Sequence, residues 1–501
     1  MPDLTVTKKD EVYLNIESDP SIASELNDYF TFDVPGARFM PTYKAKMWDG
    51  KARLFNMWTK ELYVGLLPYL REFAARSDYE MDVNMDPIGD PVDIDYLEEF
   101  AESLNLTSQG SPIQAREYQI DAVKYAIRIG RTLLLSPTAS GKSLIIYLLL
   151  RYHQQFNRKQ LVIVPTTSLV EQMYGDFADY SHEDSTWHVA NNCSKIYAGF
   201  EKSNQSNIVI STWQSIYKLP KKFFDEFDVI YGDEAHLFKA KSLTSIFNKC
   251  TKTKFRIGTT GTLDGTKTHK LILEGLFGKV HKVISTKELM EQGSVADLDI
   301  TCIVLDYADE EKKALTKYTY QEEMDWLVTH QKRNNIIKNL ATTQKGNTLV
   351  LFQFVEKHGA VLYDLINEKV GKSRQVFFVH GGTDTQQREK VREITEKEKD
   401  AVIIASYGTF STGINIRNLH NVIFASPSKS RVRNLQSIGR GLRKGDDKTS
   451  CRLFDIGDDL SWKSRKNYTL LHMIERIKLY NEEGFRYKLV RISTDGNTKG
   501  N

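Results

Sequence analysis

The chain has 501 residues, too many for one hydrophobic core, so we expect several domains. Hydrophobic residues make up 41% and charged residues 27%, as in ordinary globular proteins, and no apolar run is long enough to cross a membrane. The net charge of +3 is too small to indicate nucleic-acid binding; only the distribution of the charges can do that.

Residues 1–90 depart from the pattern of the rest and predict a small N-terminal α/β domain that binds nucleic acid. Its residues 39–55 mix basic and aromatic side chains with apolar ones, and WDGK at 48–51 predicts the turn of a β-hairpin. Cations and rings suit DNA, but the same rings suit a core, and for Trp48 burial is the stronger interpretation. For the basic residues the two alternatives stay open. The candidate nucleic-acid contacts are Lys44, Lys46, Lys51 and Arg53.

Beyond a connector at 87–112, short apolar runs end in polar tips and alternate with amphipathic stretches, as buried parallel strands alternate with helices. The first series is TLLLS, LVIVP, IVIST, DVIYGDE and FRIGTT, and the second is NTLVLFQF, RQVFFVHG, DAVIIAS, NVIFASP and CRLFDIG. They predict two α/β domains with parallel sheets, residues 91–290 and 291–501, the second with a C-terminal helical extension. The less regular stretch 285–345 is expected to hold the connection and a helix over 318–341.

The sequence SPTASGKS follows an apolar run and opens a long apolar helix, the setting of a phosphate-binding loop. The amino terminus of that helix offers N–H groups and a positive dipole end to phosphate. Gly141 permits close approach of the backbone, Lys142 can reach the β and γ phosphates, and the Ser143 hydroxyl can bind Mg²⁺. Ser136 stands where the motif usually has its first glycine.

Asp233 and Glu234 follow DVIYG, so they are expected at the carboxyl end of a strand, where parallel sheets bind ligands. Asp233 is suited to hold Mg²⁺ and Glu234 to orient the attacking water. A solvated acidic turn is the other interpretation, and the upstream Lys142 argues against it.

Two more motifs flank these. Gln119, three residues after Arg116, precedes the phosphate loop by a short helix and is placed to read an adenine edge. Late in the chain, QSIGRGLR puts Arg440 and Arg443 three residues apart, on one face of a helix. That face is either solvated or delivers positive charge to the γ-phosphate. A second basic cluster, KSRVR at 429–433, can touch DNA, nucleotide or neither.

In this order the motifs resemble those of the superfamily-2 helicases, including VPTTSLVEQ, STWQSI, DEAH, TGT at 260–262, GTFSTGIN and QSIGRGLR. The resemblance implies two RecA-like domains in tandem, with ATP and Mg²⁺ as cofactors. It implies catalysis by Lys142, Asp233, Glu234, Arg440 and Arg443. It implies nucleotide contacts at Arg116, Gln119, Ser140, Gly141, Ser143, His236 and Gln436, metal contacts at Ser143 and Asp233, and nucleic-acid contacts at Thr166, Thr212 and Thr409.

The sequences TWQSI and IGRGLR are more similar to those of the DNA-remodelling members of that superfamily. This resemblance implies a helicase or translocase that remodels branched DNA by fork regression, Holliday-junction migration and R-loop unwinding. Its partners would be branched, duplex and single-stranded DNA, RNA–DNA hybrids, and single-strand-binding or recombination proteins. An ATP-gated clamp or annealing factor without processive unwinding is the alternative.

The four cysteines, at 193, 250, 302 and 451, form no CxxC pair and no Cys/His cluster, which argues against a zinc site or a disulfide framework. The first residues lack the apolar stretch of a secretory signal. We therefore expect reduced thiols in a cytoplasmic protein.

Overall fold

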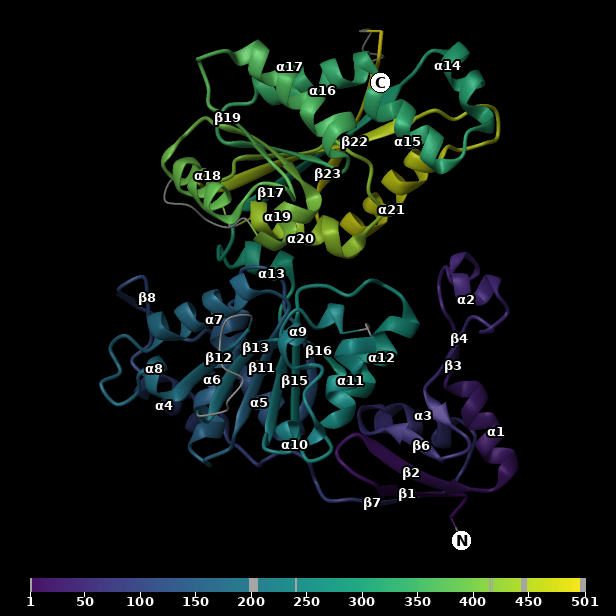
Figure 1. Ribbon diagram of the computed structural model, residues 1–501, viewed down its shortest axis with the longest axis vertical. Coiled ribbons are helices and arrows are strands. Elements are labelled where there is room, and N and C mark those ends of the chain that lie inside the picture. Colours follow the sequence, from purple (N-terminus) through teal and green to yellow (C-terminus); the bar gives the residue numbers. More distant parts are fainter. Residues whose placement is uncertain are drawn as a thin grey trace. The chain divides into compact units, whose positions relative to one another are not determined.

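The computed structural model describes residues 2–197, 206–238, 241–413, 416, 418–442 and 448–495 (Figure 1). The chain divides into two compact units, residues 1–136 with 140–284, and residues 285–501 with 137–139. Each unit has a seven-stranded parallel sheet, and the first also carries a small N-terminal sheet with helices. The predicted tandem of RecA-like α/β domains with a small N-terminal α/β region is therefore confirmed. Among the described residues, no helix is long and apolar enough to span a membrane.

The N-terminal sheet is mixed, with the order β5-β6-β2-β1-β7. Alternation in LTVTK and YLNIES puts apolar side chains on one face, which α1 and α3 cover. Leu271 of α12 (Lys267–Phe277) belongs to the same core cluster, so the small sheet packs on the first large domain. The elements are β1 (Leu4–Lys8), β2 (Tyr13–Ser18), α1 (Pro20–Tyr29), β5 (Phe55–Asn56), β6 (Glu61–Tyr63), α3 (Leu67–Arg76) and β7 (Met81–Asn84).

The first large sheet has the order β12-β13-β11-β14-β15-β10-β16. Helices α4 to α7 pack on one face, and α9 to α12 on the other. The strands are β10 (Arg131–Leu135), β11 (Gln160–Val164), β12 (Cys193–Ile196), β13 (Ile208–Thr212), β14 (Val229–Gly232), β15 (Phe255–Thr260) and β16 (Val280–Lys282). The helices are α4 (Ile94–Ser103), α5 (Glu117–Ile129), α6 (Lys142–Gln154), α7 (Thr167–Tyr180), α8 (Val189–Asn192), α9 (Trp213–Ile216), α10 (Lys221–Phe224), α11 (Lys241–Lys249) and α12.

The second large sheet has the order β19-β20-β18-β21-β22-β17-β23. Its strands are β17 (Asp297–Asp306), β18 (Thr348–Phe352), β19 (Val376–Val379), β20 (Val402–Ser406), β21 (Asn421–Phe424), β22 (Ser450–Asp459) and β23 (Tyr487–Ser493). Its helices are α13 (Thr286–Glu291), α14 (Asp309–Ala314), α15 (Tyr320–Thr329), α16 (Gln331–Thr343), α17 (Val361–Val370), α18 (Thr385–Lys397), α19 (Tyr407–Gly413), α20 (Arg431–Gly441) and α21 (Tyr468–Glu482).

Three expectations for the less regular segments were incomplete or wrong. The stretch 285–345 contains β17, a strand inside the second sheet, and the C-terminal extension contains β23, which pairs with β17. The connector contains α4, which begins after the N-cap Asp93. The single helix expected over 318–341 is two helices, because the His330 imidazole caps α16 by accepting from the Arg333 amide at 3.2 Å.

The β-hairpin expected across WDGK is also wrong. β4 (Lys51–Arg53) pairs with β3 (Thr31–Asp33), and a 3-10 turn and α2 (Pro41–Lys44) lie between the two strands. WDGK turns the chain into β4: Gly50 is left-handed at φ 81°, and the Asp49 carboxylate accepts from the Lys51 amide at 3.1 Å. The segment 34–50 is therefore an excursion from the small sheet, which we call the N-terminal excursion.

Candidate functional site

The phosphate loop joins β10 to α6 and is held by contacts within the first unit. Ala139 and Gly141 are left-handed, at φ 68° and 80°. A Cβ on Gly141 would lie 2.3 Å from the Gln119 amide nitrogen, so only glycine fits there. The buried Ser136 and Ser140 hydroxyls hydrogen-bond at 2.5 Å. Ser136, the departure from the usual glycine, thus takes part in closing the loop.

The Gln119 carboxamide holds this loop in place by hydrogen bonds. Its nitrogen donates to the Ser140 carbonyl at 2.9 Å, and its oxygen accepts from the Arg116 amide at 2.9 Å. Tyr118 donates to the same Ser140 carbonyl at 3.0 Å. An amide nitrogen carries two hydrogens, so Gln119 can hold the loop and still donate to a purine. The structure brings this motif and the loop together, as the sequence order implied.

Lys142 and Ser143 open α6, directly after the loop. The Lys142 ammonium lies 3.2 Å from the Ser136 carbonyl oxygen, where it spans the loop. The Ser143 hydroxyl lies 2.8 Å from the Tyr180 hydroxyl of α7. Both side chains are therefore at the amino end of a long helix, which favours anions.

Asp233 follows β14 and is buried, with 8% of its surface exposed. Burial and the neighbouring Glu234 raise the pKa of Asp233 above its usual value, while Lys142 and a hydrogen bond from Thr259 oppose them. The Thr259 hydroxyl donates to this carboxylate at 2.7 Å. The structure thus brings Asp233 and Lys142 close enough to interact, and burial disfavours the ionised form of the carboxylate.

Glu234 has a left-handed backbone at φ 50°, a strained conformation that often occurs at functional sites. Its carboxylate lies 3.3 Å from the His236 ring nitrogen, and that nitrogen is also 3.0 Å from the Thr260 hydroxyl. Thr260 donates to the Thr262 carbonyl at 2.9 Å. The DEAH and TGT motifs are therefore joined by one hydrogen-bonded chain.

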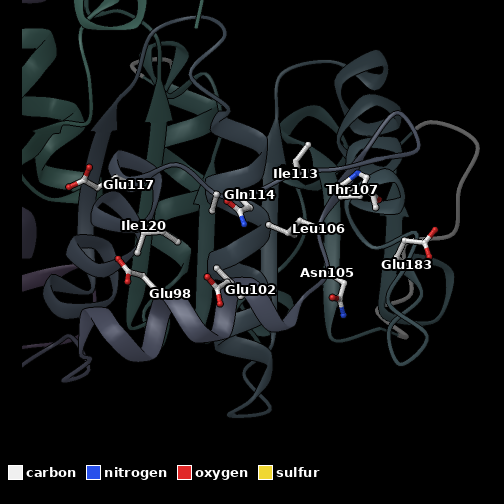
Figure 2. A pocket seen from close by; sticks show the side chains of 13 residues that line it. Glu98, Glu102, Asn105, Leu106, Thr107, Ile113, Gln114, Glu117, Ile120 and Glu183 are labelled. Atoms are coloured by element: carbon white, nitrogen blue, oxygen red, sulfur yellow. The ribbon is translucent and has the colours of Figure 1, made fainter. Parts of the chain in front are cut away.

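A cavity of about 800 Å³ lies beside the start of α5, on the face that α4 covers (Figure 2). Ile113 and Leu106 line it together with the carboxylates of Glu98, Glu102 and Glu117. These carboxylates repel phosphate, so the cavity is not suited to a triphosphate.

In the second unit, the Arg440 guanidinium lies 5.7 Å from the centre of the Phe410 ring, which joins QSIGRGLR to GTFSTGIN. Arg440 and Gln436 are both partly buried on α20. The described part of the helix ends at Gly441, so the expectation that Arg440 and Arg443 share one helical face stays a prediction. Arg443 lies outside the described residues.

Three threonines expected to touch nucleic acid stand at the starts of helices. Thr166 caps α7 by accepting from the Leu169 amide at 3.3 Å and is partly exposed. Thr212 and Thr409 are buried, and their hydroxyls lie within 2.9 Å of Ser215 and 2.8 Å of Ser406. The Thr166 residue is therefore the most accessible of the three to a phosphate.

The N-terminal excursion and the adjoining strand β4 present their cations to solvent. Lys44, Lys46, Lys51 and Arg53 are all exposed, and Trp48 is half-buried, so these side chains do not form a core. A hollow of about 610 Å³ is lined by Arg38, Tyr43, Lys44, Lys46, Met47, Trp48 and Asp49.

Sequence reasoning missed three apolar side chains on the same small domain: Phe39, Met47 and Trp58 are 67%, 80% and 95% exposed. These exposed apolar side chains add to the rings and cations that the small domain presents to solvent. Their only sequence signal was their position among basic residues.

Three protein families match parts of this chain. Residues 3–84 match the family described as the N-terminal domain of DNA helicase UvsW, residues 112–265 match the res subunit of type III restriction enzymes, and residues 331–445 match the conserved C-terminal helicase domain.

The ATP-dependent DNA helicase uvsW of Enterobacteria phage T4 is 35% identical over 98% of this chain and 100% of its own length. The crystal structure of T4 UvsW covers the same share of both chains with a TM-score of 0.52 and 32% identity. A putative HsdR subunit of a type I restriction enzyme from Vibrio vulnificus, 18% identical with a TM-score of 0.58, covers 80% of this chain and 73% of its own and shows the shared fold alone.

Proposed function

Because this chain belongs to the UvsW family of superfamily-2 DNA helicases, we propose that it uses ATP hydrolysis to remodel branched DNA. The chain is an ATP-hydrolysing helicase that binds nucleic acid. The proposal extends this to fork regression, migration of Holliday junctions and unwinding of R-loops. It also includes a cytoplasmic site of action, which the four buried, unbridged cysteines support.

The observation that carries the proposal is the N-terminal excursion. A helicase core grips mainly the sugar–phosphate backbone, which gives it little preference for a branch over a plain strand. The excursion adds exposed cations and exposed rings to the compact unit that contains Lys142 and Asp233. Cations neutralise phosphates, and rings stack on bases that a branch leaves unpaired.

For hydrolysis, we assign the phosphate contacts to the loop backbone and Lys142, and the orientation of the attacking water to Glu234. Mg²⁺ takes oxygen ligands from few protein groups and completes its shell with phosphates and water. The Ser143 hydroxyl and the Asp233 carboxylate fit that donor set, and bound Mg²⁺ would neutralise charge on the phosphates. Arg440 and Arg443 are assigned to the charge that develops on the γ-phosphate, and Arg116, Gln119, His236 and Gln436 to positioning the nucleotide.

The test is a panel of labelled forks, Holliday junctions, R-loops, linear duplexes and single strands. ATPase stimulation, strand products and displacement of a triplex-forming strand are measured on each, with Lys142→Ala as the inactive control. We expect ATP-dependent products and higher stimulation from branched substrates. ATPase stimulation with neither strand products nor triplex displacement would show the clamp or annealing factor instead.

A further inference from the structure

Two tyrosines that are far apart in sequence share one surface of the second unit. Tyr320 is the first residue of α15 and Tyr468 the first of α21, and these helices lie side by side (Figure 1). Their ring centres are 6.0 Å apart, and the His472 ring centre is 5.2 Å from that of Tyr320. Tyr320 is 38% exposed, Tyr468 40% and Leu471 beside them 43%, so the rings meet solvent. We call Tyr320, Tyr468 and His472 the aromatic patch.

A buried carboxylate fixes the two tyrosines against each other. Glu323, one turn after Tyr320, is 2% exposed. It accepts from the backbone amides of Tyr468 and Thr469 at 3.1 and 2.8 Å, and from the Asn467 side chain at 3.0 Å. A buried charge is tolerated when it is this well satisfied, and it is costly to disturb. The patch is therefore held in place before any ligand arrives.

The charges of two cations act on residues of the patch. Lys429 is exposed, and its charge is one of those that act on His472. Burial, Arg476 and Lys429 together lower the pKa of His472 to about 4, so its ring is neutral near pH 7. Burial and Glu323 raise the pKa of Tyr320, and the charge of Arg433 opposes them.

Arg433 also contacts a residue at the carboxyl edge of the second large sheet. The Arg433 guanidinium lies 5.5 Å from the Tyr407 ring centre, and the Tyr407 hydroxyl donates to the Ser426 carbonyl at 3.1 Å. Tyr407 follows β20 and Ser426 follows β21, so these residues lie at the carboxyl edge of the sheet. That edge also carries Thr409 and is where parallel sheets bind ligands.

We propose that the aromatic patch is a stacking platform for an unpaired base of single-stranded DNA, and that Lys429 and Arg433 neutralise the phosphates beside that base. Neutral rings flanked by cations are the combination that binds single strands without sequence preference. Arg431 of the same basic cluster is paired with Glu482 and Glu483, so it is not assigned this role. The inference rests on the proposed function, since it places one strand of an opened duplex on this unit.

The test replaces both tyrosines by leucine, which keeps apolar volume and removes the flat faces. Tyr320→Phe with Tyr468→Phe retains the rings, and Tyr96→Leu is the matched control, since Tyr96 is 42% exposed on the first unit. The probe is a single strand containing 2-aminopurine, whose fluorescence falls when it stacks. We expect the double leucine variant to bind this strand about tenfold more weakly and to lose the quenching, because stacking contributes about 1–3 kcal/mol per base.

Strand displacement from a fork should fall in parallel, while ATPase activity at saturating single strand stays within about twofold. The phenylalanine and Tyr96 variants should match the wild type. Wild-type binding and quenching in the double leucine variant would overturn the inference, and so would equal losses in the phenylalanine variant. If DNA does not stimulate the ATPase activity of the wild type, the proposed function itself is contradicted, so the two failures are distinguishable.

Discussion

Asp233→Asn should make the ligand-free protein more stable while abolishing ATP turnover. The carboxylate is buried beside Glu234, and its pKa is raised, so the ionised form is disfavoured in the folded state. Asparagine keeps the oxygen that accepts from Thr259 at 2.7 Å and removes the charge. Relief of a strained functional site is typically about 0.5–2 kcal/mol, and each kcal/mol raises Tm by about 2–4 °C in a domain of about 150–250 residues.

The sign of the pH dependence follows from the direction of the shift. Because the folded pKa lies above the ordinary Asp value of 3.8, the cost of the carboxylate appears as pH rises past 3.8 and is complete above the folded pKa. The stability advantage of Asp233→Asn should therefore be full near pH 7 and shrink as the pH approaches 4. Mg²⁺ with ATP should stabilise the wild type more than the variant.

The assay is thermal unfolding across pH, with and without Mg²⁺ and ATP, beside steady-state ATPase. Asp82→Asn, a change at an exposed carboxylate of β7, is the matched control and should alter neither readout. A ligand-free Asp233→Asn protein that is less stable at pH 7 than the wild type would refute the reasoning. It would mean that attraction to Lys142 outweighs burial and the repulsion from Glu234.

Lys142→Ala should lower kcat by at least about a hundredfold with folding and DNA binding intact, because it removes a charge from the phosphates; a normal kcat would contradict the assignment. Glu234→Gln should bind ATP and stall before hydrolysis, seen as a trapped nucleotide in filter binding. Arg440→Ala should reduce kcat by about a thousandfold or more with little change in ATP affinity, and an unchanged kcat would return it to a structural role beside Phe410. Glutamate at Lys44, Lys46, Lys51 and Arg53 should weaken branched-DNA binding more than linear binding and flatten its salt dependence by about 0.9 per lost phosphate contact. The same change at the exposed Lys221 and Lys222 of α10 is its control, and equal losses on both substrates would make the excursion a general anchor.

The chemistry of the nucleotide site is determined by local sequence. A phosphate loop needs a strand, a tight turn and a helix in direct succession, and residues 131–154 contain that succession. The same holds for Asp233 at the end of β14 and for the apolar runs that became β10, β11, β13, β14 and β15. Strands buried on both faces must be continuously apolar, so their pattern can be recognised without knowing their neighbours.

What only the tertiary structure decided depends on partners distant in the chain. WDGK predicts a turn, and the chain does turn there. However, β4 pairs with β3 across an intervening helix, and the local sequence does not predict which strand β4 pairs with. β17 was missed because it mixes exposed charged positions with buried ones, and β23 because none of its positions is fully buried. Tyr320 and Tyr468 meet because Glu323 caps a helix that begins more than a hundred residues later. Local patterns specify which chemistry a segment can perform, whereas shared surfaces arise from long-range packing that brings such segments together.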